Sequence, residues 1–477
     1  MRRHVLLATS ELAPWAKTGG LADVAAGLSG ALARRGHDVR IVMPCYESSL
    51  STAAPGKLVA TATIGGHRLE VIESALPGVR VWQLLCPALY GRAGTPYGSS
   101  AGEDWPDNDL RFGVFGRAVA WLACEWSGWD VRPDVLHLND WPSALAAPFV
   151  RQSGHRPGVL FTIHNLGYQG LFDRDSFDRL CGRIGLDPAW WNPTALEFHG
   201  RLSFIKAGLV FADRLSTVSP GYAREILTDE HGFGLGGLLR HRATDLRAIL
   251  NGIDTTQWNP AADPHLPHYF DAGQLEGKRQ NKLLLQRELG LVEDAARPLA
   301  AVVSRLVTQK GIDLVLDALP VLLSRGLQLA VLGTGERNLE RLLGQAHREN
   351  PQQVAFRPGM NEPLAHRLEA GADIVIMASR YEPCGLNQLY SMHYGTIPVV
   401  RRTGGLGDTV DADTGFLFDE PSPSALVAAV DEALAAYHDR TRWRELQQAG
   451  MRRDFSWDAR AAEYEQLYGE LNASPGR

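Results

Sequence analysis

One short phrase with the chemistry of an anion site occurs twice in this chain. It reads KTGGLAD over residues 17–23 and RTGGLGD over residues 402–408; five of the seven positions are identical, and both copies begin with a cation. A Gly-Gly turn lets backbone N–H groups approach an anion closely, and the neighbouring cation adds positive charge. Two copies in opposite halves of the chain predict two similar domains that bind one negatively charged ligand.

The second half also places two cations after a predicted strand. Arg305 follows the apolar run 299–303, and Lys310 comes shortly before a predicted helix. An arginine fork and a lysine point charge together suit a diphosphate, although the two could also be a surface pair on a loop. The turn Gly333-Thr334-Gly335 follows the next strand and is either a phosphate loop or a tight turn. It is not the G-x-G-x-x-G motif of dinucleotide enzymes, which argues against a dehydrogenase.

A carboxylate stands on a Pro/Gly turn in the segment SRYEPCGL, residues 379–386. Glu382 lies between a predicted strand end and a predicted helix start, where the chain holds a side chain rigidly. It could face sugar hydroxyls or the positive charge that develops during glycosyl transfer. The alternative is a carboxylate that only interacts with the helix dipole. Cys384 is predicted to be a packing residue, because no His/Asp pair near it in sequence marks a nucleophile.

Polar residues end two predicted strands of the first half. His164-Asn165 follows the run 158–163, and HLNDW, residues 137–141, ends the preceding strand. A single histidine is more often structural, but a polar pair at a strand end before glycine is a better site candidate. Trp141 and the pair Trp190-Trp191 offer flat apolar faces that suit sugar rings, while most of the twelve tryptophans should lie in the core.

Apolar runs alternate with helical periodicity along the chain, the pattern of parallel α/β units. In the first half we predict strands at 4–9, 39–43, 134–138, 158–163 and, as the last, 213–218, with helices at 21–35 and 141–153. In the second half we predict strands at 299–303, 329–332, 353–356, 374–377 and 397–400, and helices at 311–325, 335–348, 362–370 and 386–394. Helices at 424–437, 440–450 and 457–471 follow, and turn formers over 251–273 indicate the domain boundary.

Composition narrows the class of protein. A chain of 477 residues, with 45% hydrophobic and 21% charged residues, is predicted to form two globular domains. The net charge of −6 gives no footprint for nucleic acid, and no run approaches a membrane span. Five cysteines without C-x-x-C spacing argue against disulfides and zinc. We therefore expect a cytoplasmic protein with no membrane or nucleic-acid partner, and scattered D-x-D matches do not predict a metal.

Taken together, these segments resemble the family of bacterial glycogen synthases and plant starch synthases. The resemblance spans essentially the whole chain in the family's order, through the segments 17–24, 107–118, 137–141, 161–170, 250–260, 303–314 and 379–410. It implies an α/β GT-B fold, with two Rossmann-like domains facing each other across a deep cleft and a C-terminal helix crossing back to the N-terminal domain. The implied division is an acceptor-side domain at 1–249, a nucleotide-sugar domain at 250–456 and the terminal helix at 457–477.

The implied reaction moves glucose from ADP-glucose to the non-reducing end of an α-1,4-glucan, such as glycogen or a maltooligosaccharide, with retention of configuration. ADP-glucose is a substrate, and neither a cofactor nor a metal is implied. The oligomeric state stays open. Related alternatives are a retaining transferase that uses UDP-glucose or a small acceptor such as glucose 1-phosphate, and a catalytically silent glucan-binding protein.

The resemblance also assigns roles to residues. Arg305 and Lys310 would clamp the diphosphate, Glu382 would face the transferred glucose, and His164 would lie beside it. The implied substrate-binding residues are Lys17, Gly19, Gly20, Asp23, Asp140, Asn165, Cys384, Gly385, Leu386, Thr403, Gly404 and Gly405. Whether Glu382 is a nucleophile or an electrostatic partner stays open, and we favour a front-face mechanism. Pro142 departs from the family, which often has a histidine there, so acceptor geometry could differ.

Overall fold

The structure, a computed structural model, describes residues 2–52, 56–99, 102–154 and 156–471. The chain forms two compact units. Unit 1 comprises Met1–Val218, Ala223–Gly252 and Trp457–Arg477, and unit 2 comprises Ser219–Tyr222 and Ile253–Ser456. The chain therefore passes from one unit to the other mainly at 252/253 and 456/457. The sequence analysis placed the domain boundaries at 249/250 and 456/457.

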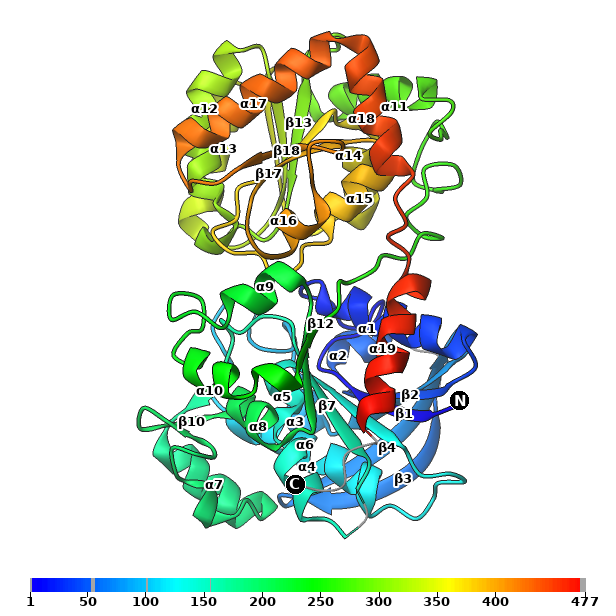
Figure 1. The fold of residues 1–477 in the computed structure, drawn as a ribbon, viewed down its shortest axis with the longest axis vertical. Helices are drawn as coiled ribbons and strands as arrows, with labels where there is room; N and C mark the ends of the chain where they lie inside the picture. The colour runs from blue at the N-terminus through cyan, green and yellow to red at the C-terminus, as the bar shows by residue number, and fades with distance from the viewer. Residues whose placement is uncertain (1, 53–55, 100–101, 155, 472–477) are drawn as a thin grey trace. The chain divides into compact units, whose positions relative to one another are not determined.

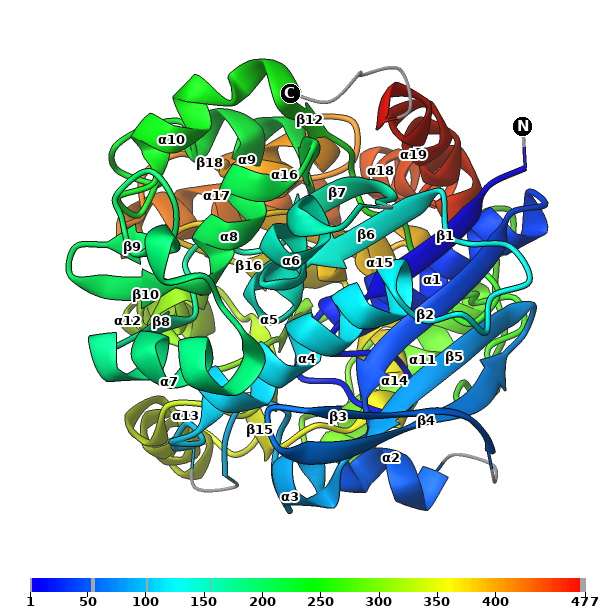
Figure 2. The same ribbon diagram turned by 90° about the horizontal axis from the view of Figure 1, so that it is seen from below.

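Unit 1 is built on a nine-stranded sheet. Its order is β12-β11-β7-β6-β1-β2-β5-β4-β3, and Figure 2 shows its central strands side by side. The strands are β1 His4–Ala8, β2 Asp38–Pro44, β3 Lys57–Ile64, β4 His67–Leu76, β5 Val79–Leu85, β6 Val135–Asn139, β7 Gly158–Ile163, β11 Arg214–Thr217 and β12 Leu246–Ala248. The strands from β12 to β5 pair in parallel, and β4 and β3 add an antiparallel edge.

The sequence analysis missed part of this sheet. It was wrong to make 213–218 the last strand of the first half, because β12 follows and pairs with β11. It also missed the edge formed by β3, β4 and β5. The hairpin between β3 and β4 turns on Gly65 and Gly66, both with positive φ, which is the geometry of a tight two-residue hairpin. That Gly-Gly pair between alternating runs was the signal available in the sequence.

The helices of unit 1 connect and cover these strands. They are α1 Leu21–Arg34, α2 Glu47–Thr52, α3 Pro87–Tyr90, α4 Asn108–Cys124, α5 Asp140–Ala144, α6 Ala146–Gln152, α7 Arg174–Ile184, α8 Phe204–Phe211 and α10 Gly236–His241. The helix α9, Pro220–Glu225, begins in unit 2 and ends in unit 1. A small antiparallel sheet joins β8 Leu171–Phe172, β10 Arg201–Ser203 and β9 Glu197–Phe198. The single helix expected at 141–153 is divided at Leu145, because Pro148 cannot donate the hydrogen bond that would continue it.

The last helix, α19 Trp457–Leu471, packs on unit 1 beside α1 (Figure 1). Glu465 of α19 binds Arg35 at 2.6 Å and the His37 ring at 2.8 Å. The Tyr468 hydroxyl lies 2.9 Å from Nδ1 of the buried His137, so α19 also reaches into the sheet at β6. The last helix of the chain is thus an integral part of the N-terminal fold.

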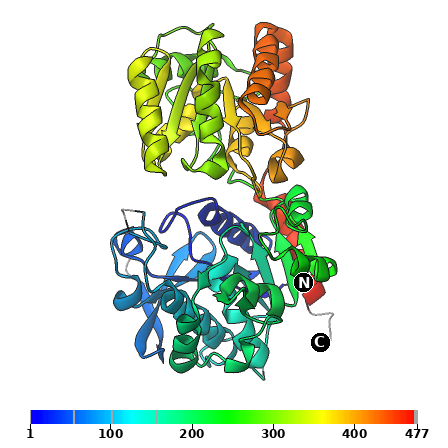
Figure 3. The same cartoon turned by 90° about the vertical axis from the view of Figure 1, so that its left-hand side faces the viewer.

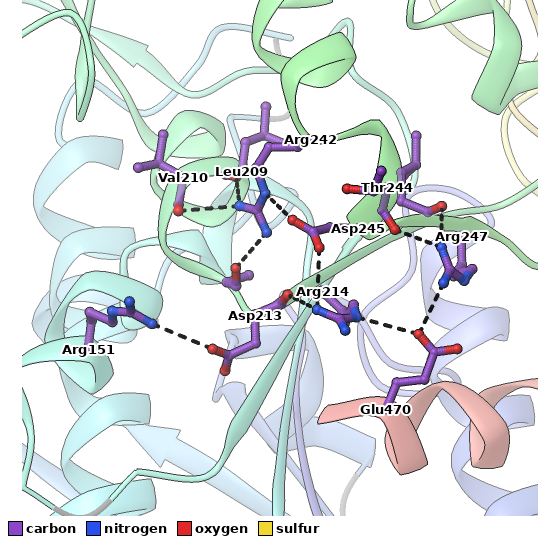
Figure 4. A network of polar contacts seen from close by, with 12 residues as sticks. Arg151, Leu209, Val210, Asp213, Arg214, Arg242, Thr244, Asp245, Arg247 and Glu470 are labelled. Carbon is purple, nitrogen blue, oxygen red and sulfur yellow. Dashed lines mark hydrogen bonds and ion pairs between the residues drawn. The ribbon is translucent and has the colours of Figure 1, made fainter. Parts of the chain in front are cut away.

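The far end of α19 is held by a chain of ion pairs (Figure 4). Glu470 lies 3.4 Å from Arg214 on β11 and 3.2 Å from Arg247 on β12. Arg214 also pairs with Asp245 at 3.3 Å, and Asp245 pairs with Arg242 at 2.7 Å. These contacts connect α19 to the edge strands of the unit 1 sheet.

Substituting Glu465 should weaken this docking in a pH-dependent way. The hydrogen bond from Arg35, with a further contribution from His37, lowers the pKa of Glu465 to about 2, while desolvation opposes the shift. A lowered carboxyl pKa stabilises the fold above the unfolded value of about 4.5 and loses that contribution as pH falls toward 2. Glu465→Gln should therefore lower the free energy of unfolding at pH 7, and its difference from wild type should shrink between pH 4.5 and 2. Urea titrations across that range measure this; a constant difference would contradict it.

Unit 2 is a six-stranded parallel sheet with helices on both faces (Figure 3). The order is β15-β14-β13-β16-β17-β18, for β13 Leu299–Val303, β14 Gln328–Gly333, β15 Val354–Pro358, β16 Ile374–Met377, β17 Ile397–Arg401 and β18 Phe416–Phe418. The helices are α11 Glu276–Leu289, α12 Ile312–Ser324, α13 Arg337–Glu349, α14 Glu362–Gly371, α15 Asn387–His393, α16 Gly404–Thr409, α17 Pro423–His438 and α18 Arg440–Met451. The five predicted strands are all present, while α11 and β18 were not predicted.

Alternate residues of β13 show how both faces of this sheet are buried. Ala300 and Val302 pack with α12 and α17, whereas Leu299 and Ala301 pack with α11 and α14. A strand covered on both sides must be apolar throughout, which is why these strands read as short continuous runs. The connecting loops then project from the carboxyl ends of the strands, where ligands bind in such sheets.

Candidate functional site

The carboxyl ends of β13 and β16 bring together Lys310 and Glu382, two predicted site residues to which the sequence analysis gave separate roles, in unit 2. Lys310 Nζ lies 2.5 Å from Glu382 Oε2, and the Ser379 hydroxyl donates to the same oxygen at 3.0 Å. The side chains of Lys310 and Glu382 are only 17% and 7% exposed. This is a nearly dry ion pair in which each charge depends on the other.

The close approach of the Lys310 loop to the end of β16 depends on a glycine. Gly311 follows Lys310 with φ +67°, and a Cβ at this position would collide with the carbonyl of Ala378, just after β16. The Lys310 loop can therefore lie directly on the end of β16 only because residue 311 has no side chain. Arg380 fastens the same two loops: its guanidinium binds Asp313 at 2.6 and 2.8 Å and the carbonyl of Thr308 at 2.7 Å.

The turn Gly333-Thr334-Gly335 serves as a tight turn in this structure. A Cβ on Gly333 or Gly335 would collide with the carbonyl of Ser304 or Leu306. The Gly335 N–H donates to Glu340 at 2.9 Å and the Leu306 N–H to the carbonyl of Thr334 at 2.8 Å. The turn thus supports the loop that follows β13, on which Arg305 is exposed.

The second Thr-Gly-Gly-Leu copy opens α16 and packs on the Glu382 loop. Thr403 precedes the helix, and Gly404 takes a positive φ of +42°. The Gly405 N–H donates to the carbonyl of Glu382 at 3.1 Å, and a Cβ on Gly405 would collide with the backbone of the buried Cys384. The Gly405 N–H thus positions the Glu382 loop. The sequence analysis predicted a substrate contact for Gly405 and did not predict this structural role.

The segment after Glu382 is equally constrained. Gly385 has φ +71°, and Leu386 is the N-cap of α15. The Gln388 amide donates to the carbonyls of Cys384 and Gly385, at 3.0 Å each. These bonds hold the turn that presents Glu382.

In unit 1, the ends of β6 and β7 bring Asp140, His164 and Asn165 together. Asp140 Oδ1 accepts the backbone N–H of His164 at 2.8 Å and that of Asn165 at 3.4 Å. The ring Nε2 of His164 lies 2.9 Å from Oδ1 of Asn139. Burial raises the pKa of Asp140 to about 7 and lowers that of His164 to about 3, so the histidine is neutral at physiological pH.

The backbone of the first Thr-Gly-Gly-Leu copy binds Glu11, a carboxylate outside the copy that the sequence analysis missed. The N–H groups of Thr18 and Gly19 donate to Glu11 Oε2 at 2.7 and 3.1 Å, and the Tyr97 hydroxyl donates to Oε1 at 2.7 Å. Glu11 is 4% exposed. It follows β1 as a polar strand-end residue, which was the available signal. The Gly-Gly turn therefore already binds an anion of this chain.

Lys17 and Asp23 form an ion pair of 2.9 Å beside this turn, and both side chains are about one-quarter exposed. Gly20 is the N-cap of α1, and the helix has no side-chain cap there. The carboxylate of Asp23 thus balances the charge of Lys17, and the first N–H groups of α1 add the partial positive charge of a helix N-terminus.

The tryptophans expected to offer sugar platforms are half-buried and pack against other aromatic rings of unit 1. Trp141 contacts Phe112, Phe172 and Phe204, with ring centroids 4.7 to 6.1 Å apart. Trp190 packs on Phe149 and Phe211, and Trp191 packs on Phe177 and under Arg174. Their aromatic area stabilises unit 1.

The residues that the structure describes contain neither a metal-binding cluster nor a membrane-spanning helix. No cluster of three or more His, Cys, Asp or Glu side chains in this part of the chain could hold a metal ion. None of its helices is both long and apolar enough to cross a bilayer.

Comparison with known proteins identifies the class. Residues 4–241 match the starch synthase catalytic domain, and residues 290–449 match the glycosyl transferases group 1. The catalytic domain of Arabidopsis thaliana starch synthase IV, solved with ADP and acarbose, superposes with a TM-score of 0.91 at 33% identity, over 99% of this chain and 100% of that one. Sucrose-phosphate synthase from Thermosynechococcus elongatus shares the fold, with a TM-score of 0.64 at 20% identity, over 99% and 100% of the two chains. The protein is a GT-B glycosyltransferase.

Two full-length relatives define the family more closely. The glycogen synthase of Thioalkalivibrio sulfidiphilus is 49% identical, over 98% of this chain and 99% of its own. That of Marinobacter nauticus is 50% identical, over 99% of each chain. This chain belongs to the bacterial glycogen synthase family.

Proposed function

We propose that this protein transfers glucose from ADP-glucose to the non-reducing end of an α-1,4-glucan with retention of configuration. The observation that carries the proposal is the nearly dry Lys310–Glu382 pair at the carboxyl ends of β13 and β16. Full-length similarity to glycogen synthases supports the choice of donor and acceptor.

The reaction needs opposite charges stabilised at two places. As the bond between glucose C1 and the phosphate oxygen breaks, negative charge grows on ADP and positive charge on the sugar. Lys310 and Arg305 would stabilise the departing diphosphate, and Glu382 would stabilise the positive sugar. The acceptor hydroxyl then bonds to C1 from the same face, and its proton passes to the departing phosphate oxygen.

Unit 1 supplies the remaining contacts of this proposal. The neutral His164, together with Asp140 and Asn165, would bind sugar hydroxyls. Lys17 and the start of α1 would bind donor phosphate. Glu11 would fix the shape of the turn rather than contact phosphate, because it already holds the N–H groups of Thr18 and Gly19. No step requires a metal or an organic cofactor.

A matrix of two donors and two acceptors tests the proposal. Purified protein receives ADP-glucose or UDP-glucose, each with glycogen or glucose 1-phosphate, and incorporation of labelled glucose is measured. Incorporation into glycogen should be fastest from ADP-glucose. A preference for UDP-glucose would overturn the donor assignment, product from glucose 1-phosphate alone would overturn the acceptor, and glycogen binding without transfer would indicate a silent binding protein.

A further inference from the structure

Asn139, the last residue of β6, is a buried amide with a fixed orientation. It is 2% exposed, and its Nδ2 donates to the carbonyl of Ala8 on β1 at 3.1 Å. A backbone carbonyl can only accept, so the amide nitrogen must face Ala8. The amide oxygen therefore faces the other way, toward His164.

This orientation determines which ring nitrogen of His164 carries the proton. Nε2 lies 2.9 Å from Oδ1 of Asn139, and an amide oxygen can only accept a hydrogen bond. Nε2 must then be the donor. Because burial keeps the pKa of this imidazole near 3, the ring is neutral and Nδ1 has a lone pair instead of a proton.

The backbone of His164 is fixed as well. Asp140, in a left-handed conformation with φ +53°, accepts the His164 N–H at 2.8 Å. Both ends of the residue are thus anchored by consecutive residues at the end of β6. The Asn139 amide is the one ring hydrogen-bond partner that the structure records for His164 among the residues it describes.

His137, which lies on β6 two residues before Asn139, provides a contrast. Its Nε2 lies 2.6 Å from the Thr162 hydroxyl and its Nδ1 lies 2.9 Å from the Tyr468 hydroxyl. Hydroxyls can donate or accept, so these partners do not select a tautomer. Of these two histidines, only His164 therefore has a ring partner that selects one tautomer.

We propose that Asn139 is a positioning residue that locks His164 in the Nε2–H tautomer, so that Nδ1 accepts a hydrogen bond from a hydroxyl of the substrate sugar. The second half of this inference rests on the proposed function. The first half concerns the free protein and can be tested without substrate.

The tautomer is measured directly by nitrogen NMR of protein labelled at histidine. The His164 signals are identified by their loss in His164→Gln. In wild type, Nε2 should show the shift of a protonated ring nitrogen and Nδ1 that of an unprotonated one throughout pH 5 to 8. A proton on Nδ1, or a charged ring at neutral pH, would overturn the inference whatever the enzyme's activity.

Asn139→Asp tests the consequence for turnover. A carboxylate beside Nε2 favours the charged imidazolium, in which Nδ1 carries a proton and cannot accept. The ratio of variant to wild-type kcat/KM should fall at least tenfold from pH 8 to pH 5.5. Because the added carboxylate lies next to Asp140, whose pKa burial raises to about 7 in wild type, the loss is assigned to His164 only at pH values where nitrogen NMR of the variant shows a proton on Nδ1 of His164. His137 keeps its hydroxyl partners.

Thr162→Val is the matched control, since it removes a partner of His137 and leaves the Asn139 contact intact. Thr162→Val should show neither the tautomer change nor the pH-dependent loss.

A flat ratio of kcat/KM across the pH range in folded Asn139→Asp would refute the role of Nδ1. If Asn139→Asp does not fold, Asn139→Ala should lose the single-tautomer spectrum of His164, and an unchanged spectrum would refute the lock. A wild type inactive with ADP-glucose and glycogen would contradict the proposed function, while the tautomer would still decide this inference.

Discussion

Lys310→Met is expected to lose both stability and turnover. It leaves the Glu382 carboxylate, only 7% exposed, without its cation. Breaking a buried pair on one side typically costs about 3–5 kcal/mol of folding free energy. Loss of a preorganised charge at the leaving group should lower kcat by a factor on the order of 10² to 10³. Urea unfolding and initial rates with ADP-glucose and glycogen measure the two effects.

The double variant Lys310→Met/Glu382→Gln separates these losses. It removes both charges, so most of the lost stability should return, because a neutral pair of similar size leaves no charge buried alone. Turnover should stay as low as in Lys310→Met, since neither developing charge is then stabilised. Recovery of turnover together with stability would show that the pair is only structural.

Gly311→Ala is expected to have the second largest effect. The residue has φ +67°, and the added methyl group would collide with the carbonyl of Ala378. The left-handed conformation alone costs a non-glycine residue about 1–2 kcal/mol. The collision adds to this and moves the Lys310 loop off the end of β16, so kcat should fall at least tenfold.

Gly326→Ala is the matched control for this substitution. Gly326 also has a positive φ, of +87°, but an added Cβ would meet nothing within 4 Å. It should show the conformational cost, seen as a shift in the urea midpoint, with kcat within about twofold of wild type. Equal kcat values in the two variants would contradict the positioning role of Gly311.

The fold of unit 2 was predicted well because its strands are buried on both faces. Such strands are short apolar runs bounded by turns, and β13 and β16 match the predicted ranges residue for residue. The edge of unit 1 was missed because β3 is exposed or half-buried at every position except Ile64 and has little apolar contrast. β12 has only three residues, none of them fully buried, so its pairing with β11 leaves almost no sequence signal.

The predicted site residues fall into two groups. Strand-end reasoning found Lys310, Glu382, Asp140 and His164, and the structure brings them together in pairs within their own units. It did not find Asn139 or Glu11, whose roles come from hydrogen bonds to the ring of His164 and to the turn at Thr18. The folded backbone decides which backbone N–H groups and ring nitrogens need a hydrogen-bond partner. The spacing of residues in the sequence alone therefore does not predict these roles.

The central claim is tested most directly by following one glucose from donor to product. The protein is incubated with ADP-glucose and maltotetraose, and the released ADP and the chain length and anomeric configuration of the product are measured. We predict one ADP released for each glucose added, with every new residue α-1,4-linked at the non-reducing end. Release of ADP without elongation, or a product with the opposite anomeric configuration, would contradict retaining transfer to a glucan.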